Sequence, residues 1–130
     1  MKYRHNIDDV TPTMVTGREI RTMLGRDVLG SKELTLQVID VLPEAVSKPG
    51  HCHDNCEEVI YVQSGKGDIL IDGELVHMVP GDVVYLPRDV PHLTRNRGMA
   101  PMRLICVFST VSLKEGMKGM PDLDYPDTQS

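Results

Sequence analysis

Short apolar runs separated by glycine and proline are the feature that most constrains how this chain can fold. Each run holds roughly four to eight residues, the length of a β-strand, and beyond the first thirty residues no segment keeps a helical period for long. Many short strands at regular spacing, bounded by turn residues, are typical of a sandwich or barrel. The sequence therefore predicts an all-β fold.

The expected strands cover most of the chain between its middle thirties and residue 109. Between two of them, Asp72-Gly73 predicts a hairpin, because a two-residue loop of this kind favours positive φ angles and a type I′ turn. Val15–Met23 fits either an edge strand or a short helix, and Met117–Ser130, rich in proline and aspartate, is expected to be a loosely ordered tail. The expected strands are Leu34–Leu42, Glu58–Gln63, Asp68–Ile71, Leu75–Met78, Val83–Leu86, His92–Arg95 and Met102–Ser109.

Length and composition limit the possible class of protein. A chain of 130 residues suits one domain, and with 40% apolar and 25% charged residues it is neither disordered nor membrane-like. The net charge is −5 and the basic residues are scattered, which argues against a nucleic-acid partner. The N-terminus lacks the apolar stretch of a signal peptide, and three cysteines suggest free thiols, so the cytoplasm is the expected compartment.

One stretch carries the residues most suggestive of chemistry. His51 and His53 are two residues apart on an extended segment, so their side chains project from the same face. Glu58 begins the next apolar run, where a carboxylate pointing into the interior would be costly without a metal or a cationic partner. His92 follows a proline-rich turn. Imidazole nitrogens with one carboxylate suit iron, manganese, nickel, zinc or copper and not calcium.

A single histidine in a strand is more often a structural residue than a ligand. His5 and His77 are interpreted in that way. The coincidence of an HxH pair, a strand-initial glutamate and a later proline-flanked histidine favours a metal site formed by His51, His53, Glu58 and His92.

These residues also carry a resemblance to a known family. The chain resembles the cupin superfamily, in the form of a small, one-domain conserved barrel of the cupin-2 type. The first cupin motif is matched by His51-x-His53, Glu58 and Gly65, and the second by Gly81, Pro87, His92 and Asn96. The initial glycine of the first motif is replaced by Ala45, and Asp89 replaces the middle glycine of the second. Both departures fall in turns, and aspartate tolerates left-handed backbone geometry better than most residues.

The resemblance implies a double-stranded β-helix, the cupin jelly-roll barrel, with His51, His53, Glu58 and His92 converging on one divalent transition-metal ion. It places the barrel at residues 31–112, with a C-terminal tail at 113–130. It also implies a homodimer. The N-terminal segment, residues 1–30, is expected to pack on the barrel or on the partner.

Two classes of function follow from such a site. The first is a metal-dependent enzyme acting on a small oxygen-rich metabolite, as a dioxygenase, isomerase, decarboxylase or lyase. The second is a non-catalytic module that binds a small carboxylate, a sugar or the metal itself. Either implies a small-molecule partner. Because the chain lacks tryptophan and has one phenylalanine, a small polar ligand fits better than a flat aromatic one.

The sequence leaves the remaining site residues open. Glu57, Tyr85 and Arg103 are candidates for a general acid or base. The candidates for orienting a ligand are Gln37, Tyr85, Thr94 and Arg103, although each of them taken singly is interpreted as an outward-facing sheet residue.

The cysteines leave a similar choice. A regular strand turns Cys52 away from the metal, whereas Cys56 shares the parity of Glu58 and could approach the pocket. In the final strand, either Cys106 or its neighbours Ile105 and Val107 must face the cavity.

Overall fold

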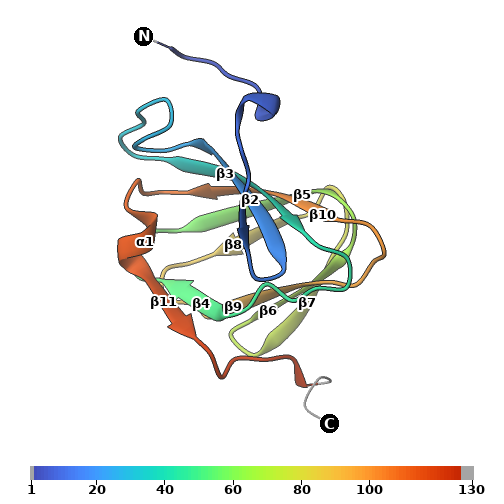
Figure 1. Ribbon diagram of the computed structural model, residues 1–130. Helices are drawn as coiled ribbons and strands as arrows, with labels where there is room; N and C mark the ends of the chain where they lie inside the picture. Colours follow the sequence, from blue (N-terminus) through green and yellow to red (C-terminus); the bar gives the residue numbers. More distant parts are fainter. Residues whose placement is uncertain (1, 127–130) are drawn as a thin grey trace.

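Two antiparallel β-sheets face each other in the computed structural model, which describes residues 2–126 (Figure 1). The first sheet contains, in spatial order, β1 (Thr13–Val15), β2 (Arg18–Leu24), β3 (Thr35–Val41), β10 (Met102–Phe108), β5 (Glu58–Ser64) and β8 (Val83–Leu86). The second contains β11 (Met117–Met120), β4 (Gly50–His53), β9 (His92–Asn96), β6 (Gly67–Ile71) and β7 (Glu74–Met78). The helical elements are η1 (Ile7–Asp9) and α1 (Leu113–Gly116). The predicted all-β jelly-roll barrel is confirmed.

The core lies between the two sheets and follows from the alternation of side chains along the strands. In β10 the residues of one parity are buried and their neighbours are partly exposed, and β5 alternates in the same way. Val62 of β5 and Met102 of β10 are completely buried in this core. Neither of the helices that the structure describes has the length and apolar character needed to cross a membrane.

Two turns confirm expectations from the sequence. Asp72 and Gly73 have φ angles of 48° and 83°, as a type I′ hairpin requires, and they connect β6 to β7. Asp89, which stands where the cupin motif has glycine, has a φ of 66° and so adopts the left-handed conformation that glycine would supply. The departure from the motif therefore preserves the backbone path that leads into β9.

The N-terminal region extends the first sheet. β1 and β2 form a hairpin around Gly17, and β2 pairs along its length with β3. Val15–Met23 is thus extended, with a turn at Thr16-Gly17, and the helical alternative is wrong. One face of β2 completes the sheet that encloses the interior.

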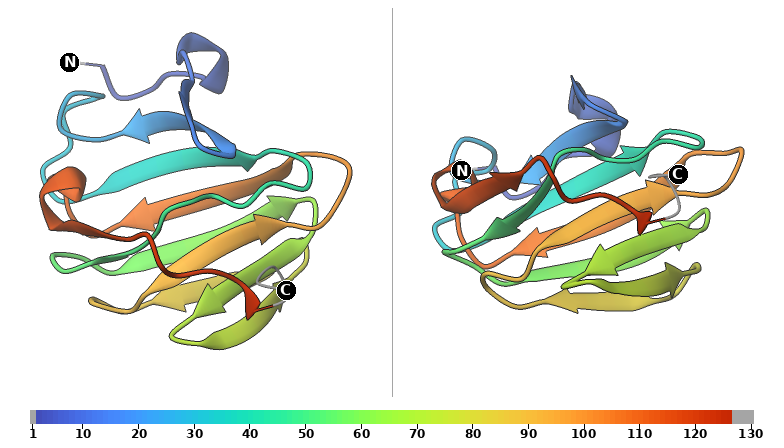
Figure 2. Two further views of the ribbon diagram at one scale, coloured as in Figure 1. Left: turned by 60° about the horizontal axis from the view of Figure 1, so that its bottom comes forward. Right: turned by 90° about the horizontal axis from the view of Figure 1, so that it is seen from below.

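The expectation of a loosely ordered tail from Met117 onward is wrong for the residues that the structure describes. β11 pairs with β4 beside the two histidines, and the C-terminal segment continues along the second sheet (Figure 2). Leu123 packs on Gly50, where an added Cβ would lie 2.6 Å from its Cδ2. Tyr125 is completely buried, with Oη 2.6 Å from the carbonyl oxygen of Leu93. The few large side chains of the segment are therefore enough to hold it against the second sheet. The remainder of the expected tail, residues 127–130, lies outside the described residues.

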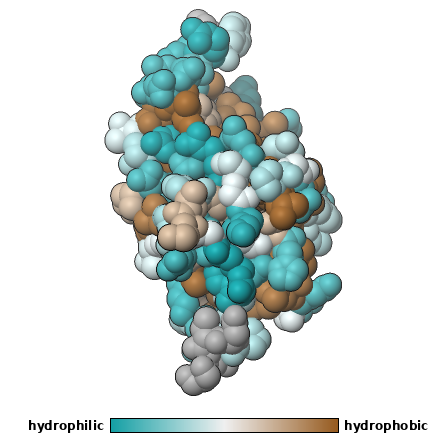
Figure 3. Space-filling view, turned by 90° about the vertical axis from the view of Figure 1, so that its right-hand side faces the viewer, coloured by the Kyte–Doolittle hydropathy of each residue, from teal (hydrophilic) through white to brown (hydrophobic). Residues whose placement is uncertain are grey.

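The outer surface is mixed in character. The face in Figure 3 shows separate hydrophobic patches among hydrophilic residues. Outside the first sheet, Asp40 accepts hydrogen bonds from Nε and Nη2 of Arg103, at 2.8 and 2.9 Å, and from Nη1 of Arg21 at 3.3 Å. Arg103 is therefore part of an outer ion-pair network.

Candidate metal centre

Three strands bring the sequence-predicted ligands together. His51 and His53 lie on β4, Glu58 is the first residue of β5, and His92 is the first residue of β9. β4 and β9 are neighbours, with His51 directly opposite His92. The backbone N–H of Asp89 donates to the carbonyl oxygen of His53 at 2.8 Å, so the turn before β9 is fixed on β4. The paired strands and this turn fix the relative positions of the histidines.

The four side chains converge on one region inside the barrel. Ring nitrogens of His51, His53 and His92 all lie within 4.8 Å of one another. Oε1 of Glu58 is 3.5 Å from Nε2 of His53 and 3.5 Å from Nε2 of His92. Since metal–nitrogen distances are about 2.0–2.1 Å, small side-chain shifts would bring the three nitrogens onto a common ion.

Backbone carbonyls orient two of the imidazoles. Nδ1 of His51 lies 3.2 Å from the carbonyl oxygen of Pro49, and Nδ1 of His92 lies 3.0 Å from that of Val90. Each Nδ1–H donates to its carbonyl, which leaves the lone pair on Nε2. Metal-binding histidines are commonly fixed in this way by a hydrogen bond from the other ring nitrogen.

Unpaired polar atoms show that the site suits a cation. Both ring nitrogens of His53 and Oε1 of Glu58 are buried and have no hydrogen-bond partner among the described residues. Burying such atoms without a partner costs about 1–3 kcal/mol each, and more for a charged group. One divalent ion placed here would accept a lone pair from one ring nitrogen of His53 and another from Oε1 of Glu58, so the residues present fit a metal.

The electrostatic environment favours the metal-binding protonation states of His51 and Glu58. Burial and the neighbouring His92 lower the pKa of His51 to about 4, so its imidazole is neutral at pH 7. Burial raises the pKa of Glu58, but the adjacent His53 and His92 outweigh it, and the net shift is downward. A neutral imidazole and an ionised carboxylate are the forms that bind metals.

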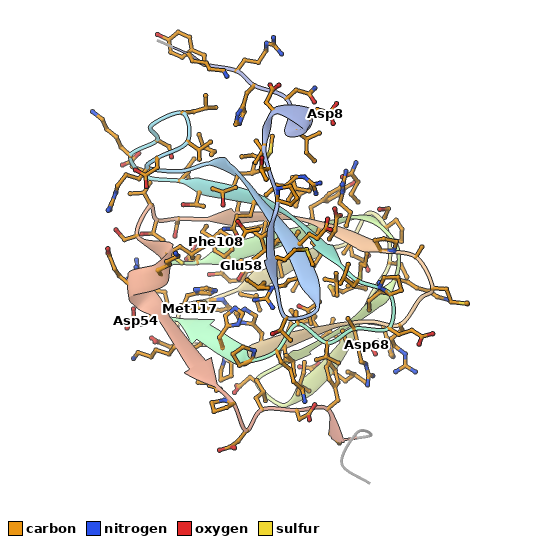
Figure 4. The ribbon with its side chains drawn as sticks, in the orientation of Figure 1. Asp8, Asp54, Glu58, Asp68, Phe108 and Met117 are labelled. Atoms are coloured by element: carbon orange, nitrogen blue, oxygen red, sulfur yellow. The ribbon has the colours of Figure 1, made fainter. Side chains whose placement is uncertain are left out.

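A cavity of about 390 Å³ opens beside these residues. Its walls come from both sheets and from the N-terminal and C-terminal segments, and Figure 4 marks Glu58, Phe108 and Met117 among them. Apolar side chains form much of the lining, interrupted by a few polar ones. The lining residues are Thr13, Val15, Arg18, Ile20, Thr22, Gln37, Ile39, Val41, Ser47, His51, Glu58, Ile60, His92, Thr94, Leu104, Cys106, Phe108, Leu113, Lys114 and Met117.

The candidates for further site residues divide into two groups. Of the ligand-orienting candidates, Gln37 and Thr94 line the cavity. Tyr85, Glu57 and Arg103 do not. The Tyr85 hydroxyl donates to Oε1 of Glu57 at 3.0 Å on an exposed surface, and Arg103 pairs with Asp40. As general acids or bases these three are wrong, because strand parity turns Tyr85 and Arg103 outward and Glu57 lies outside the barrel beside Tyr85.

The cysteines are sorted by the same geometry. Cys106 lines the cavity, whereas the buried thiols of Cys52 and Cys56 do not. Burial and the nearby Glu58 carboxylate raise the pKa of Cys106 well above its ordinary value, and burial raises that of Cys56 to about 11. Cys56 and Cys106 therefore carry neutral thiols at pH 7.

Sequence reasoning missed the lining residues that come from the two ends of the chain. Arg18 and Thr22 enter from β2, whereas Lys114 and Met117 enter from α1 and β11. One signal was available: Arg18, Ile20 and Thr22 share the parity that an inward-facing strand requires. This parity could be used only once Val15–Met23 was known to be a strand and not a helix.

Comparisons with known proteins agree with this fold. The chain is 25% identical over 126 residues to the polyketide synthase CurC of Streptomyces cyaneus, a match spanning 96% of this chain and 77% of that protein. A shorter match, 34% identical over 56 residues, covers 43% of this chain and 45% of the uncharacterized protein MJ1618 of Methanocaldococcus jannaschii. Among solved structures, Streptomyces Pac13, described as a nucleoside dehydratase, is similar with a TM-score of 0.79 at 13% identity over 92% of each chain. Residues 37–108 match the Cupin domain family, and the chain therefore belongs to that family.

Proposed function

We propose that the chain binds one divalent transition-metal ion through His51, His53, Glu58 and His92 and acts as a metal-dependent enzyme on a small oxygen-rich molecule. The observation that carries the proposal is the convergence of these four side chains, with buried polar atoms on His53 and Glu58 that lack any other described partner. The proposed metal site adjoins the cavity, because His51, Glu58 and His92 also line it.

The donor set narrows the metal to a group. Three imidazoles and one carboxylate suit iron, manganese, nickel, zinc or copper. When bound, such an ion supplies Lewis-acid polarisation of a substrate oxygen or, in the case of iron, redox chemistry with dioxygen.

The residues of the chain define the space in which a substrate would bind. The carbonyls of Pro49 and Val90 hold the imidazoles of His51 and His92 in position. Apolar side chains form much of the cavity wall, and Nε2 of Gln37 donates to Oγ1 of Thr22 at 3.2 Å, which adds a polar strip to it. A molecule with a few oxygens and an apolar body matches this lining.

The known relatives support a small-molecule enzyme. CurC is named as a polyketide synthase and Pac13 as a nucleoside dehydratase that has been studied with uridine. The proposal therefore covers dioxygenase, isomerase, decarboxylase and lyase reactions. It does not choose among them.

One observation favours the second candidate, a non-catalytic binding module. Among the described residues that line the cavity, Glu58 is the only carboxylic acid, and it is also a candidate ligand. Cys106 carries a thiol whose pKa is raised, so it stays protonated at pH 7 and is not available as a base. Catalysis would therefore depend on the metal and on substrate groups for proton transfer.

Metal analysis and turnover test the two parts of the proposal separately. We expect the purified protein to contain about one transition-metal ion per chain, and His51→Ala and His92→Ala to lose most of it while keeping the fold. His77→Ala is the matched control, because His77 pairs with Asp68 away from the cavity. Full metal content in both cavity variants would refute the ligand assignment.

Turnover separates the enzyme from the binding module. Metal-loaded protein would be incubated with diketones, keto acids, catechols and uronates while oxygen uptake and product formation are followed. Product formation that the cavity variants abolish supports an enzyme, whereas tight binding without turnover throughout the panel supports the binding module.

A further inference from the structure

A cation stands in the cavity wall without an acidic partner. Arg18 begins β2, is half-buried and lines the cavity together with Ile20 and Thr22. Nη1 of Arg18 donates to two backbone carbonyl oxygens, those of Thr16 at 3.0 Å and Lys48 at 3.4 Å. No carboxylate of the described residues lies within ion-pair distance of it. The other cavity cation, Lys114, is exposed and therefore well screened.

The two carbonyls hold the guanidinium but leave its other edge free. A guanidinium has five N–H donors, and Thr16 and Lys48 engage only those of Nη1. Nε–H and the Nη2 group have no acceptor among the described residues, and neither atom is sealed in the protein interior. These two nitrogens form the fork that binds a carboxylate through two parallel hydrogen bonds.

The net charge of the cavity also favours an anionic ligand. Arg18 lines the same cavity as Glu58, and burial lowers the pKa of its guanidinium, with Cys106 and Glu58 partly offsetting that effect. Glu58 is the one acid among the described lining residues. A bound divalent ion, Arg18 and Glu58 together leave this cavity with excess positive charge.

We propose that Arg18 is the substrate's carboxylate anchor, and that the cavity takes a small monocarboxylate with an apolar body. The fork of Arg18 would receive the carboxylate, and side chains such as Ile39, Leu104 and Phe108 would cover the body. The proposal rests on the proposed function for the role of the metal, but it concerns a different part of the cavity. It narrows the small oxygen-rich molecule to one chemical class.

Octanoate and its neutral isostere octanamide are the probes for this class. Their binding is measured by calorimetry to the protein as purified and again after a chelator has removed metal. Because charge-assisted, bidentate hydrogen bonds are the strong ones, we expect octanoate to bind at least about ten-fold more tightly than octanamide in both states. Equal affinities, or no binding of octanoate, would overturn the proposal.

Substitution assigns the preference to one residue. Arg18→Met removes the fork and should abolish the preference for octanoate, while Arg18→Lys should keep only part of it because an ammonium is a point charge. Arg21→Met is the matched control: Arg21 lies on the same strand but pairs with Asp40 on the outer side of the sheet. Full preference in a folded Arg18→Met variant would refute the assignment.

Metal content separates this proposal from the proposed function. Arg18→Met should retain the metal of the wild type, since Arg18 is not a ligand. If the preference for octanoate disappears with the chelator but persists in Arg18→Met, the metal binds the carboxylate. That result would refute the role of Arg18 and would leave the proposed metal site intact. If the purified protein contains no metal but its preference for octanoate depends on Arg18, the metal site is refuted and the role of Arg18 is supported.

Discussion

Replacing Tyr125 with phenylalanine measures how firmly the C-terminal segment is attached beside the metal centre. The Tyr125 hydroxyl lies 2.6 Å from the carbonyl oxygen of Leu93 and 3.1 Å from that of Asp68, and the residue is completely buried. Leu93 adjoins the proposed ligand His92, and the same C-terminal segment supplies Met117 to the cavity wall.

The expected cost follows from the contacts of the hydroxyl. Removing one buried hydrogen bond and leaving its acceptors dry costs about 1–2 kcal/mol, which for a domain of this size lowers Tm by about 4–7 °C. Tyr125→Ala also empties the volume of the ring, and its cost should rise to about 3–5 kcal/mol. The ring would no longer lie under the Arg95 guanidinium, now 4.0 Å from its centroid.

Thermal and urea denaturation followed by circular dichroism provide the assay. Tyr3→Phe is the matched control, because Tyr3 is 83% exposed and its hydroxyl should contribute nothing measurable. A Tyr125→Phe variant as stable as the wild type, and a Tyr125→Ala variant with cooperative unfolding and unchanged Tm, would refute the reasoning that this segment is part of the folded barrel.

Three further predictions concern single carboxylates. Glu58→Gln should lower metal affinity at least about ten-fold in a competition titration, because an amide oxygen carries no charge, whereas Glu57→Gln should leave it unchanged; equal losses would contradict the choice between them. Hydrogen bonds from Arg95, His77 and Arg97 hold the pKa of the buried Asp68 below its ordinary value against the opposing effect of burial. Its contribution to stability is therefore full above about pH 4 and lost as the pH falls through the lower folded-state pKa. The difference in unfolding free energy between wild type and Asp68→Asn should shrink below pH 4, and a difference that grows there would contradict the sign. Asp89→Gly should preserve both stability and metal content, whereas Asp89→Val should cost about 1–2 kcal/mol because a β-branched residue resists a φ of 66°; denaturation and metal analysis would show whether the order is reversed.

Sequence periodicity predicted the middle of the barrel because the physical signal there is local. Alternating apolar residues and turn pairs such as Asp72-Gly73 mark a strand whatever lies beyond it. Most expected strands agree with those observed to within a residue or two, and β4 was anticipated as the extended segment carrying His51 and His53. The ligand candidates share that advantage, since strand parity alone puts these two histidines on one face.

The ends of the chain were harder because their order depends on distant contacts. The Tyr125 hydroxyl donates to the carbonyls of Leu93 and Asp68, and Gly116 packs against Asn55. Because these partners are distant in sequence, the local composition does not predict the strand β11. At the other end, Arg18 reveals its position only when β2 is known to pair with β3. The identity of the inward-facing residues in the last strand, such as Cys106, likewise requires the register.

Anomalous X-ray diffraction from crystals grown with the native metal tests the central claim most directly. Data collected on both sides of the absorption edge of that metal should give one strong peak per chain, bounded by Nε2 of His51, Nε2 of His92, a ring nitrogen of His53 and a carboxylate oxygen of Glu58. A map with no peak at this position, in protein that elemental analysis shows to contain metal, would contradict the claim.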